Sequence, residues 1–145
     1  MRRKIEWTQS NNNITLNDII KIQELFGIAF PKDYVQCVLE NDGGYPSPDN
    51  FDIENYGEQV LNNFLSFDKH DDAYIIDAYN DIKDRLVKKV YPFAEDPFGN
   101  MVCFDFRCNS EPLIVFWDSE ISFDSSEEAI ILISKSFSEF MDSLY

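Results

Sequence analysis

The sequence predicts an α+β fold: a mainly antiparallel sheet of about five to six strands, flanked by helices from the N-terminal, middle and C-terminal parts of the chain. Apolar residues recur at helical spacing in the first third, in the middle and at the end, whereas residues 90–133 carry short apolar runs typical of strands. No repeat or Pro/Gly/Ser-rich linker divides the 145 residues. We expect one domain over residues 1–145, with residues 1–13 as a polar N-terminal extension.

The first two helices are predicted by their caps. Thr15 and Asp18 form a variant of the capping box, and apolar residues then follow at helical spacing as far as Gly27, which suits a left-handed C-terminal position. Pro31 has no backbone donor to lose in a first helical turn, so it suits the start of a second helix that ends at residues 41–44.

The middle of the chain is less regular. Residues 45–59 contain two prolines, a glycine and scattered acids, so we expect an irregular surface segment with a short strand near Phe51–Ile53. A strand is expected over residues 60–67, and Asp71 or Asp72 should cap a third helix. The predicted buried stripe of that helix comprises Ile75, Tyr79, Ile82 and Leu86.

Branched and aromatic runs predict antiparallel strands in the second half of the chain, at residues 90–94, 101–106 and 113–117. The runs 121–123 and 129–133 could extend the sheet. A last helix opens with the capping box of Ser136 and Glu139. Its predicted buried residues are Phe137, Phe140, Met141 and Leu144.

Charge is the strongest compositional feature, because 12 basic and 27 acidic residues give a net charge of −15. No Lys or Arg lies between Asp33 and Asp68, and only Arg107 interrupts the acids between Pro92 and Ser134. Nucleic acid and anionic membranes would be repelled, so a basic protein is the expected partner. Without an apolar stretch that suits a membrane span or signal peptide, we expect a cytoplasmic protein.

A basic cluster stands apart from this pattern, at the end of the predicted third helix. Cations at a helix C-terminus complement the helix dipole, and an anion-binding site is the alternative interpretation. The cluster comprises Lys83, Arg85, Lys88 and Lys89.

The sequence contains no catalytic or metal-binding signature. His70 is the single histidine and lies in a polar turn, and the glycine-rich phosphate and dinucleotide motifs are missing. Cys37, Cys103 and Cys108 are expected to be reduced core residues. The acidic stretch from Asp52 resembles the start of an EF-hand loop without its later ligands, which would allow at most a weak cation site. We predict no enzymatic activity, cofactor or metal.

Four sequence blocks follow one another in an order that is typical of a known family. Residues 27–34 with 41–46 resemble the pattern G-x-x-L-P-x-D-Y … N-G-G-x-P, and residues 92–105 resemble P-(I/F)-A-x-D-x-x-G-N-x-(I/V)-C-x-D. Residues 114–120 and 136–140 resemble V-x-x-W-D-H-E and S-F-x-E-F-L. In this order the four blocks resemble the SUKH superfamily of Smi/Knr-type domains, although Phe30 replaces the usual leucine and Ser119 the common histidine.

This resemblance implies a bacterial immunity protein that binds and neutralises a cognate toxin domain, with a regulatory protein-binding scaffold of the cell-wall or signalling type as the alternative. A nuclease toxin would present a basic cleft that an acidic surface can fill as a phosphate mimic. Oligomeric state stays open between monomer and weak dimer. Tyr45, Phe51 and Tyr56 are candidate aromatic anchors, with capping of the core as the alternative role. The expected partner-binding residues are Asp42, Tyr45, Asp49, Asp52, Glu54, Tyr56, Asp96, Asp105, Asp118 and Glu120.

Overall fold

A five-stranded antiparallel sheet forms the centre of the computed structural model, which describes residues 4–145. Its strands lie in chain order, so each pairs with the next along the sequence. They are β5 (Asn63–Phe64), β6 (Val90–Glu95), β7 (Met101–Asp105), β8 (Leu113–Trp117) and β9 (Ile130–Ser134). The strands predicted at 90–94, 101–106, 113–117 and 129–133 are confirmed, as is the α+β class.

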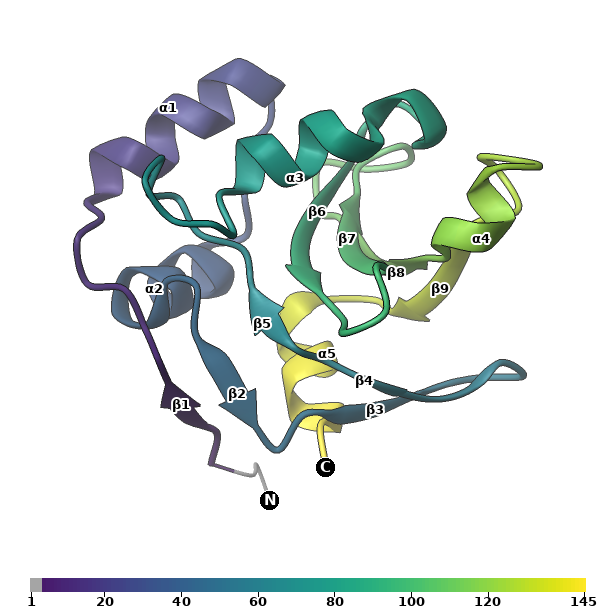
Figure 1. Ribbon diagram of the computed structural model, residues 1–145, viewed down its shortest axis with the longest axis horizontal. Coiled ribbons are helices and arrows are strands. Elements are labelled where there is room, and N and C mark those ends of the chain that lie inside the picture. The colour runs from purple at the N-terminus through teal and green to yellow at the C-terminus, as the bar shows by residue number, and fades with distance from the viewer. Residues whose placement is uncertain (1–3) are drawn as a thin grey trace.

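Five α-helices surround this sheet within the described residues, and Figure 1 shows α1 and α3 along one end of the molecule. The helices are α1 (Leu16–Phe26), α2 (Lys32–Asn41), α3 (Ile75–Ile82), the short α4 (Ser119–Ser122) and α5 (Phe137–Ser143). A 3-10 turn, η1 (Lys83–Arg85), continues α3. No helix in residues 4–145 has the length and apolar character needed to cross a membrane.

Both faces of the sheet are buried. On one face, Phe93 and Phe104 stack at 4.2 Å between ring centroids and pack against Tyr34 of α2 and Phe137 of α5. On the other face, Trp117 belongs to a second apolar cluster formed with the end of α3. Burial on two sides explains why β7 is a continuous apolar run rather than an alternating one.

The predicted helix boundaries are confirmed where local capping defines them. The Thr15 N–H donates to the Asp18 carboxylate at 2.8 Å, and Gly27 has the left-handed φ of 72° that ends α1. At the start of α5, the Ser136 hydroxyl accepts the Glu139 N–H at 3.1 Å. These interactions satisfy backbone groups that a helix end leaves free.

The segment 45–59 is more regular than predicted. It contains β2 (Tyr45–Ser47), which pairs with β1 (Glu6–Thr8), and most of a hairpin formed by β3 (Asn50–Ile53) and β4 (Gly57–Val60). The short strand near Phe51–Ile53 is confirmed, because these two residues alternate into the core. Part of the predicted N-terminal extension is thus a strand. The single strand expected over 60–67 is wrong, since only β5 pairs with β6.

Two further predictions are wrong for a shared reason, which is that an aspartate can cap a turn as well as a helix. Asp71 accepts the Ala73 N–H in the preceding turn, and α3 begins four residues later at Ile75. Asp118 caps α4, so residues 121–123 do not form a strand. The cysteine prediction also needs correction, because Cys103 is buried and Cys37 half-buried, whereas Cys108 is exposed.

Candidate partner-binding surface

Hairpin β3–β4 and helix α4 are joined through one carboxylate. Tyr56, at the hairpin tip, packs its ring 5.8 Å from that of Phe116 and donates a hydrogen bond to Asp118. Asp118 also accepts the backbone N–H groups of Glu120 at 3.0 Å and Ile121 at 3.2 Å. Figure 1 shows the hairpin extending on the same side of the molecule as α4. Three predicted residues, Tyr56, Asp118 and Glu120, therefore meet at one place.

A second carboxylate, Asp96, is close enough for its charge to act on Tyr56, and it fixes the turn between β6 and β7. Asp96 accepts the N–H groups of Phe98 and Asn100 at 2.8 Å each, and the Asn100 side-chain amide at 2.8 Å. The side-chain oxygen of Asn100, Oδ1, in turn accepts the Ser119 N–H at 2.9 Å. The expectation that Asp96 lies on the surface is wrong, because these donors hold it inside the turn with 6% exposure.

The electrostatic environment of the hairpin tip is strongly negative. The pKa of Tyr56 is raised to about 12, first by burial and then by the hydrogen bond to Asp118 and its charge. The carboxylates of Asp96 and Glu120 raise it further. The same carboxylates that disfavour ionisation of the Tyr56 hydroxyl would attract a positively charged group of a partner.

Two exposed aromatic residues flank this region, and sequence reasoning missed both. Phe98, on the β6–β7 turn, is 75% exposed, and Phe123, after α4, is 71% exposed. A signal for Phe98 was present, because it stands between Pro97 and Gly99 in a turn where no periodicity buries it. We name as the hairpin–α4 surface the set Asp52, Glu54, Tyr56, Glu58, Phe98, Asp118 and Glu120.

Two acids of the hairpin, Asp52 on β3 and Glu58 on β4, are register partners. The Tyr145 hydroxyl bridges the carboxylates of Asp52 and Glu58, with 2.6 Å to an oxygen of each. These hydrogen bonds raise the pKa of Tyr145. The backbone of Tyr145 also exchanges hydrogen bonds with Asn50, at 2.9 and 3.0 Å, which fixes the C-terminal residue to β3. Asp52 and Glu54 are exposed, as a partner-binding role requires.

Asp42 is not a surface residue, contrary to expectation. It is fully buried, where its carboxylate accepts the Ser66 hydroxyl at 2.5 Å and the Phe67 N–H at 2.8 Å. Burial raises the pKa of Asp42 to about 6, with smaller contributions from Asp71 and Asp68. Its contacts tie the end of α2 to the segment after β5, which is a structural role.

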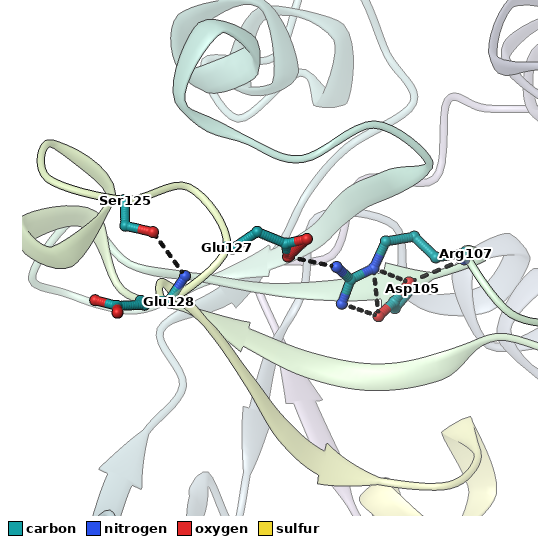
Figure 2. Close-up of polar contacts among 5 residues, drawn as sticks. All are labelled: Asp105, Arg107, Ser125, Glu127 and Glu128. Atoms are coloured by element: carbon teal, nitrogen blue, oxygen red, sulfur yellow. Dashed lines mark hydrogen bonds and ion pairs between the residues drawn. The ribbon is translucent and has the colours of Figure 1, made fainter.

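Asp105 is also buried, at 5% exposure, so its expected surface role is wrong. Figure 2 shows Arg107 between two carboxylates, 2.9 Å from Asp105 and 2.8 Å from Glu127. The Asp105 carboxylate accepts the Arg107 N–H as well, at 2.9 Å. This arrangement links the end of β7 to the segment before β9. It also neutralises Arg107, the one basic residue among the acids between Pro92 and Ser134.

The remaining predicted residues lie elsewhere or inside. Tyr45 is half-buried on β2, opposite Thr8 of β1. Asp49 is half-buried, and its carbonyl accepts the Leu61 N–H at 2.8 Å. The anchor role suggested for Phe51 is wrong, because this side chain is fully buried in the core.

The basic cluster after α3 contains one residue with a clear structural role. The Arg85 guanidinium lies 4.0 Å from the Phe123 ring centroid and 5.1 Å from that of Trp117. It also donates to the Ser122 hydroxyl at 2.6 Å and the Ser119 carbonyl at 3.1 Å. Arg85 thereby holds α4 against η1.

The EF-hand-like stretch that begins at Asp52 lies in the hairpin β3–β4. In the described part of the chain, no group of three or more His, Cys, Asp or Glu side chains is arranged to hold a metal ion. Two acids of the hairpin, Asp52 and Glu58, instead accept hydrogen bonds from the Tyr145 hydroxyl.

Comparisons with known proteins agree with this architecture. The model of the SMI1/KNR4 family (SUKH-1) matches residues 13–143. Among curated proteins, the chain is similar to the SPbeta prophage-derived uncharacterized protein YokK of Bacillus subtilis (strain 168), with 34% identity over 88 residues. That alignment covers 59% of this chain and 42% of the relative, so the chain spans less than half of the relative's length.

Proposed function

Because this chain belongs to the SMI1/KNR4 family (SUKH-1), we propose that it is an immunity protein that binds a bacterial toxin domain and neutralises it. The family establishes the scaffold, and the function depends on what the surface of this member can bind. The observation that carries the proposal is the hairpin–α4 surface, where carboxylates surround exposed aromatic rings in a chain with a net charge of −15.

The charge of this surface selects a basic partner. A nuclease toxin must hold polyphosphate, so its cleft is lined by Lys and Arg, and a carboxylate-rich surface can occupy it. Complementary charge raises the association rate to about 10⁸ M⁻¹s⁻¹ or more at low salt. Glu54 and Glu120 are exposed and meet no positive residue in the contacts described above, so their charges are free to act on a partner.

The aromatic residues of the same surface supply affinity. Exposed aromatic side chains at the centre of an interface contribute most of its binding energy, whereas charged rim residues contribute mainly rate and specificity. Phe98 projects from a turn that Asp96 and Asn100 hold in place, so little ordering entropy is lost when a partner covers its ring. Tyr56 is fixed in the same way by Asp118.

We further propose that the chain acts by binding alone, in the cytoplasm, without chemistry of its own. A perturbed carboxyl group is often a catalytic candidate, and Asp42, with a pKa of about 6, is the clearest example in this chain. Its side chain has no exposure to solvent and is held by Ser66 and Phe67, so it has no access to a substrate.

Co-expression tests the proposal directly. The chain would be expressed in bacteria together with the toxin domain encoded beside its gene, and colony survival would be counted. Survival with the wild-type chain, and loss of survival with Phe98→Ala combined with Glu120→Gln, is the expected result. Death in the presence of well-expressed, folded wild-type chain would contradict it and would favour a regulatory scaffold that binds a host protein.

A further inference from the structure

The two edges of the central sheet differ in whether neighbouring backbone covers them. At one edge, β5 is only two residues long and is covered by neighbouring backbone. The Phe64 N–H donates to the Gly44 carbonyl at 2.9 Å, and Ser66 forms an isolated parallel β-bridge with Tyr74. At the other edge, β9 pairs with β8, and no further strand pairs with it in residues 4–145.

The backbone geometry identifies the open part of β9. The Asp118 N–H donates to the Ala129 carbonyl at 3.0 Å, and alternate residues of an antiparallel strand direct their N–H and C=O groups toward the same neighbour. Counting along the strand from Ala129, the backbone N–H and C=O groups of Ile131 are directed toward β8, and those of Leu132 are directed away from it. The Leu132 side chain is also 53% exposed. The middle of β9 therefore offers both unpaired backbone groups and apolar surface.

The composition of β9 lacks the usual protection of an edge strand. Exposed edges normally carry a charged residue or a proline, which prevents pairing with another chain. Residues 129–134, Ala-Ile-Ile-Leu-Ile-Ser, have neither, although the chain contains 27 acidic residues. The charges lie at the two ends instead, with Glu127 and Glu128 before the strand, as Figure 2 shows, and Lys135 after it.

We propose that β9 is a self-association edge, which pairs antiparallel with β9 of a second copy of this chain about a two-fold axis at Leu132. Antiparallel pairing places the acidic end of one strand beside Lys135 of the other copy, whereas parallel pairing would place like charges together. The two Leu132 side chains would lie opposite each other on one face of the extended sheet. This strand offers no charge to the basic partner proposed above, which favours a second copy as the occupant.

Net charge sets the strength and the salt dependence of this contact. Two copies that each carry −15 repel each other, and the short strand pairing must overcome this repulsion. Added salt screens repulsion between exposed charges. The dimer should therefore strengthen with ionic strength, whereas binding of a basic toxin should weaken. This opposite dependence separates the failure of one proposal from that of the other.

Analytical ultracentrifugation of the full chain tests the proposal, at protein concentrations from about 10 µM to about 1 mM and at about 50 and 500 mM salt. The dimer fraction should rise with both variables. Leu132→Lys places two ammonium groups opposite each other and should leave a monomer. The control Leu25→Lys changes a leucine that is 67% exposed on α1, and it should dimerise like the wild type.

A wild-type chain that stays monomeric throughout would overturn the proposal, as would equal dimerisation of Leu132→Lys and the control. Loss of toxin protection in Leu132→Lys with a monomeric wild type would assign the edge to the toxin and would also overturn it. Should Leu132→Lys fail to fold, amide hydrogen exchange of the wild type decides. Exchange at Leu132 should slow as concentration rises, and unchanged exchange would contradict self-pairing.

Discussion

Tyr56 and Asp118 lie 62 positions apart in the sequence, yet the Tyr56 hydroxyl donates a hydrogen bond to the Asp118 carboxylate. The same carboxylate caps the N-terminus of α4. Through this single contact, a hairpin from the first half of the chain and a helix from the second half form one surface. The hydrogen bond therefore matters for the shape that a partner would meet.

Replacing Tyr56 with Phe should loosen this surface without unfolding the domain. The ring keeps its contact with Phe116. Loss of the hydrogen bond should lower the free energy of unfolding by about 1 kcal/mol, which is less than for a buried hydrogen bond to a charged group because solvent reaches this site. Amide hydrogen exchange should accelerate in β3, β4 and α4. Tyr145→Phe, whose hydroxyl bonds only hairpin acids, is the control and should leave α4 unchanged. Equal exchange in α4 for both variants would contradict the linkage.

The same contact predicts a titration result. Asp118→Asn removes a negative charge next to the Tyr56 hydroxyl, so the phenolate is less disfavoured and the pKa of Tyr56 should fall from about 12 toward the ordinary value of 10.0. Carbon NMR of labelled tyrosine measures this directly. Asp72→Asn, an exposed acid in another loop, is the control and should not move it. An unchanged pKa in Asp118→Asn would show that burial alone sets it.

The buried Asp42 predicts a pH dependence of stability. Its pKa is raised from 3.8 to about 6, so the folded chain binds this proton more tightly than the unfolded chain does. The stabilising contribution is full below about pH 4 and is lost as the pH rises through about 6. Asp42→Asn cannot ionise, so its free energy of unfolding, relative to wild type, should rise by about 3 kcal/mol over that window and then level off.

Denaturant unfolding at several pH values measures this difference, and Asp72→Asn again serves as the exposed control. A difference between Asp42→Asn and wild type that stays constant from pH 4 to 7 would contradict the assignment, because it would mean that Asp42 ionises at the same pH in both states.

Arg85 should be irreplaceable by lysine. Lysine keeps the charge but lacks the planar group that stacks on Phe123 and Trp117 while donating to Ser122 and Ser119. Arg85→Lys should therefore lower the free energy of unfolding by about 1 kcal/mol.

Thermal or denaturant unfolding measures this loss, with the exposed Lys88→Ala as the control for removing a cation from the same cluster. Equal stability of Arg85→Lys and wild type would show that charge, and not stacking, explains the position of Arg85.

Much of the fold could be predicted from the sequence, because its signals are local. Thr15 and Ser136 cap helices within three residues of themselves, and Gly27 ends one through its own φ. The strands after residue 90 follow from short apolar runs. In contrast, Asp71 and Asp118 show that an aspartate capping a turn and one capping a helix have the same local pattern, so the elements that follow them were misassigned.

The candidate site was predictable only in part. Asp96 and Asp105 looked like surface acids, because their burial depends on donors that the fold brings to them, which are turn amides in one case and Arg107 in the other. The meeting of Tyr56 with Asp118 depends on how the hairpin packs over β8, a long-range contact with no local signal. Composition nevertheless predicted the acidic character of the surface.

If the hairpin–α4 surface attracts a basic partner, the association rate depends on where the negative charges lie and not only on their total number. One variant would combine Asp52→Asn, Glu54→Gln, Glu58→Gln and Glu120→Gln, and its matched control would neutralise four exposed acids around α3, Asp72, Asp77, Asp81 and Asp84. Both lose four negative charges. Folding of each is checked by thermal unfolding before binding is compared.

The most direct measurement is the association rate of each variant with the toxin domain, by stopped-flow fluorescence at about 50 and about 300 mM salt. We expect the hairpin–α4 variant to associate at least tenfold more slowly at low salt and with a weaker salt dependence, while the α3 control stays close to wild type. Equal rates for the two variants would contradict it.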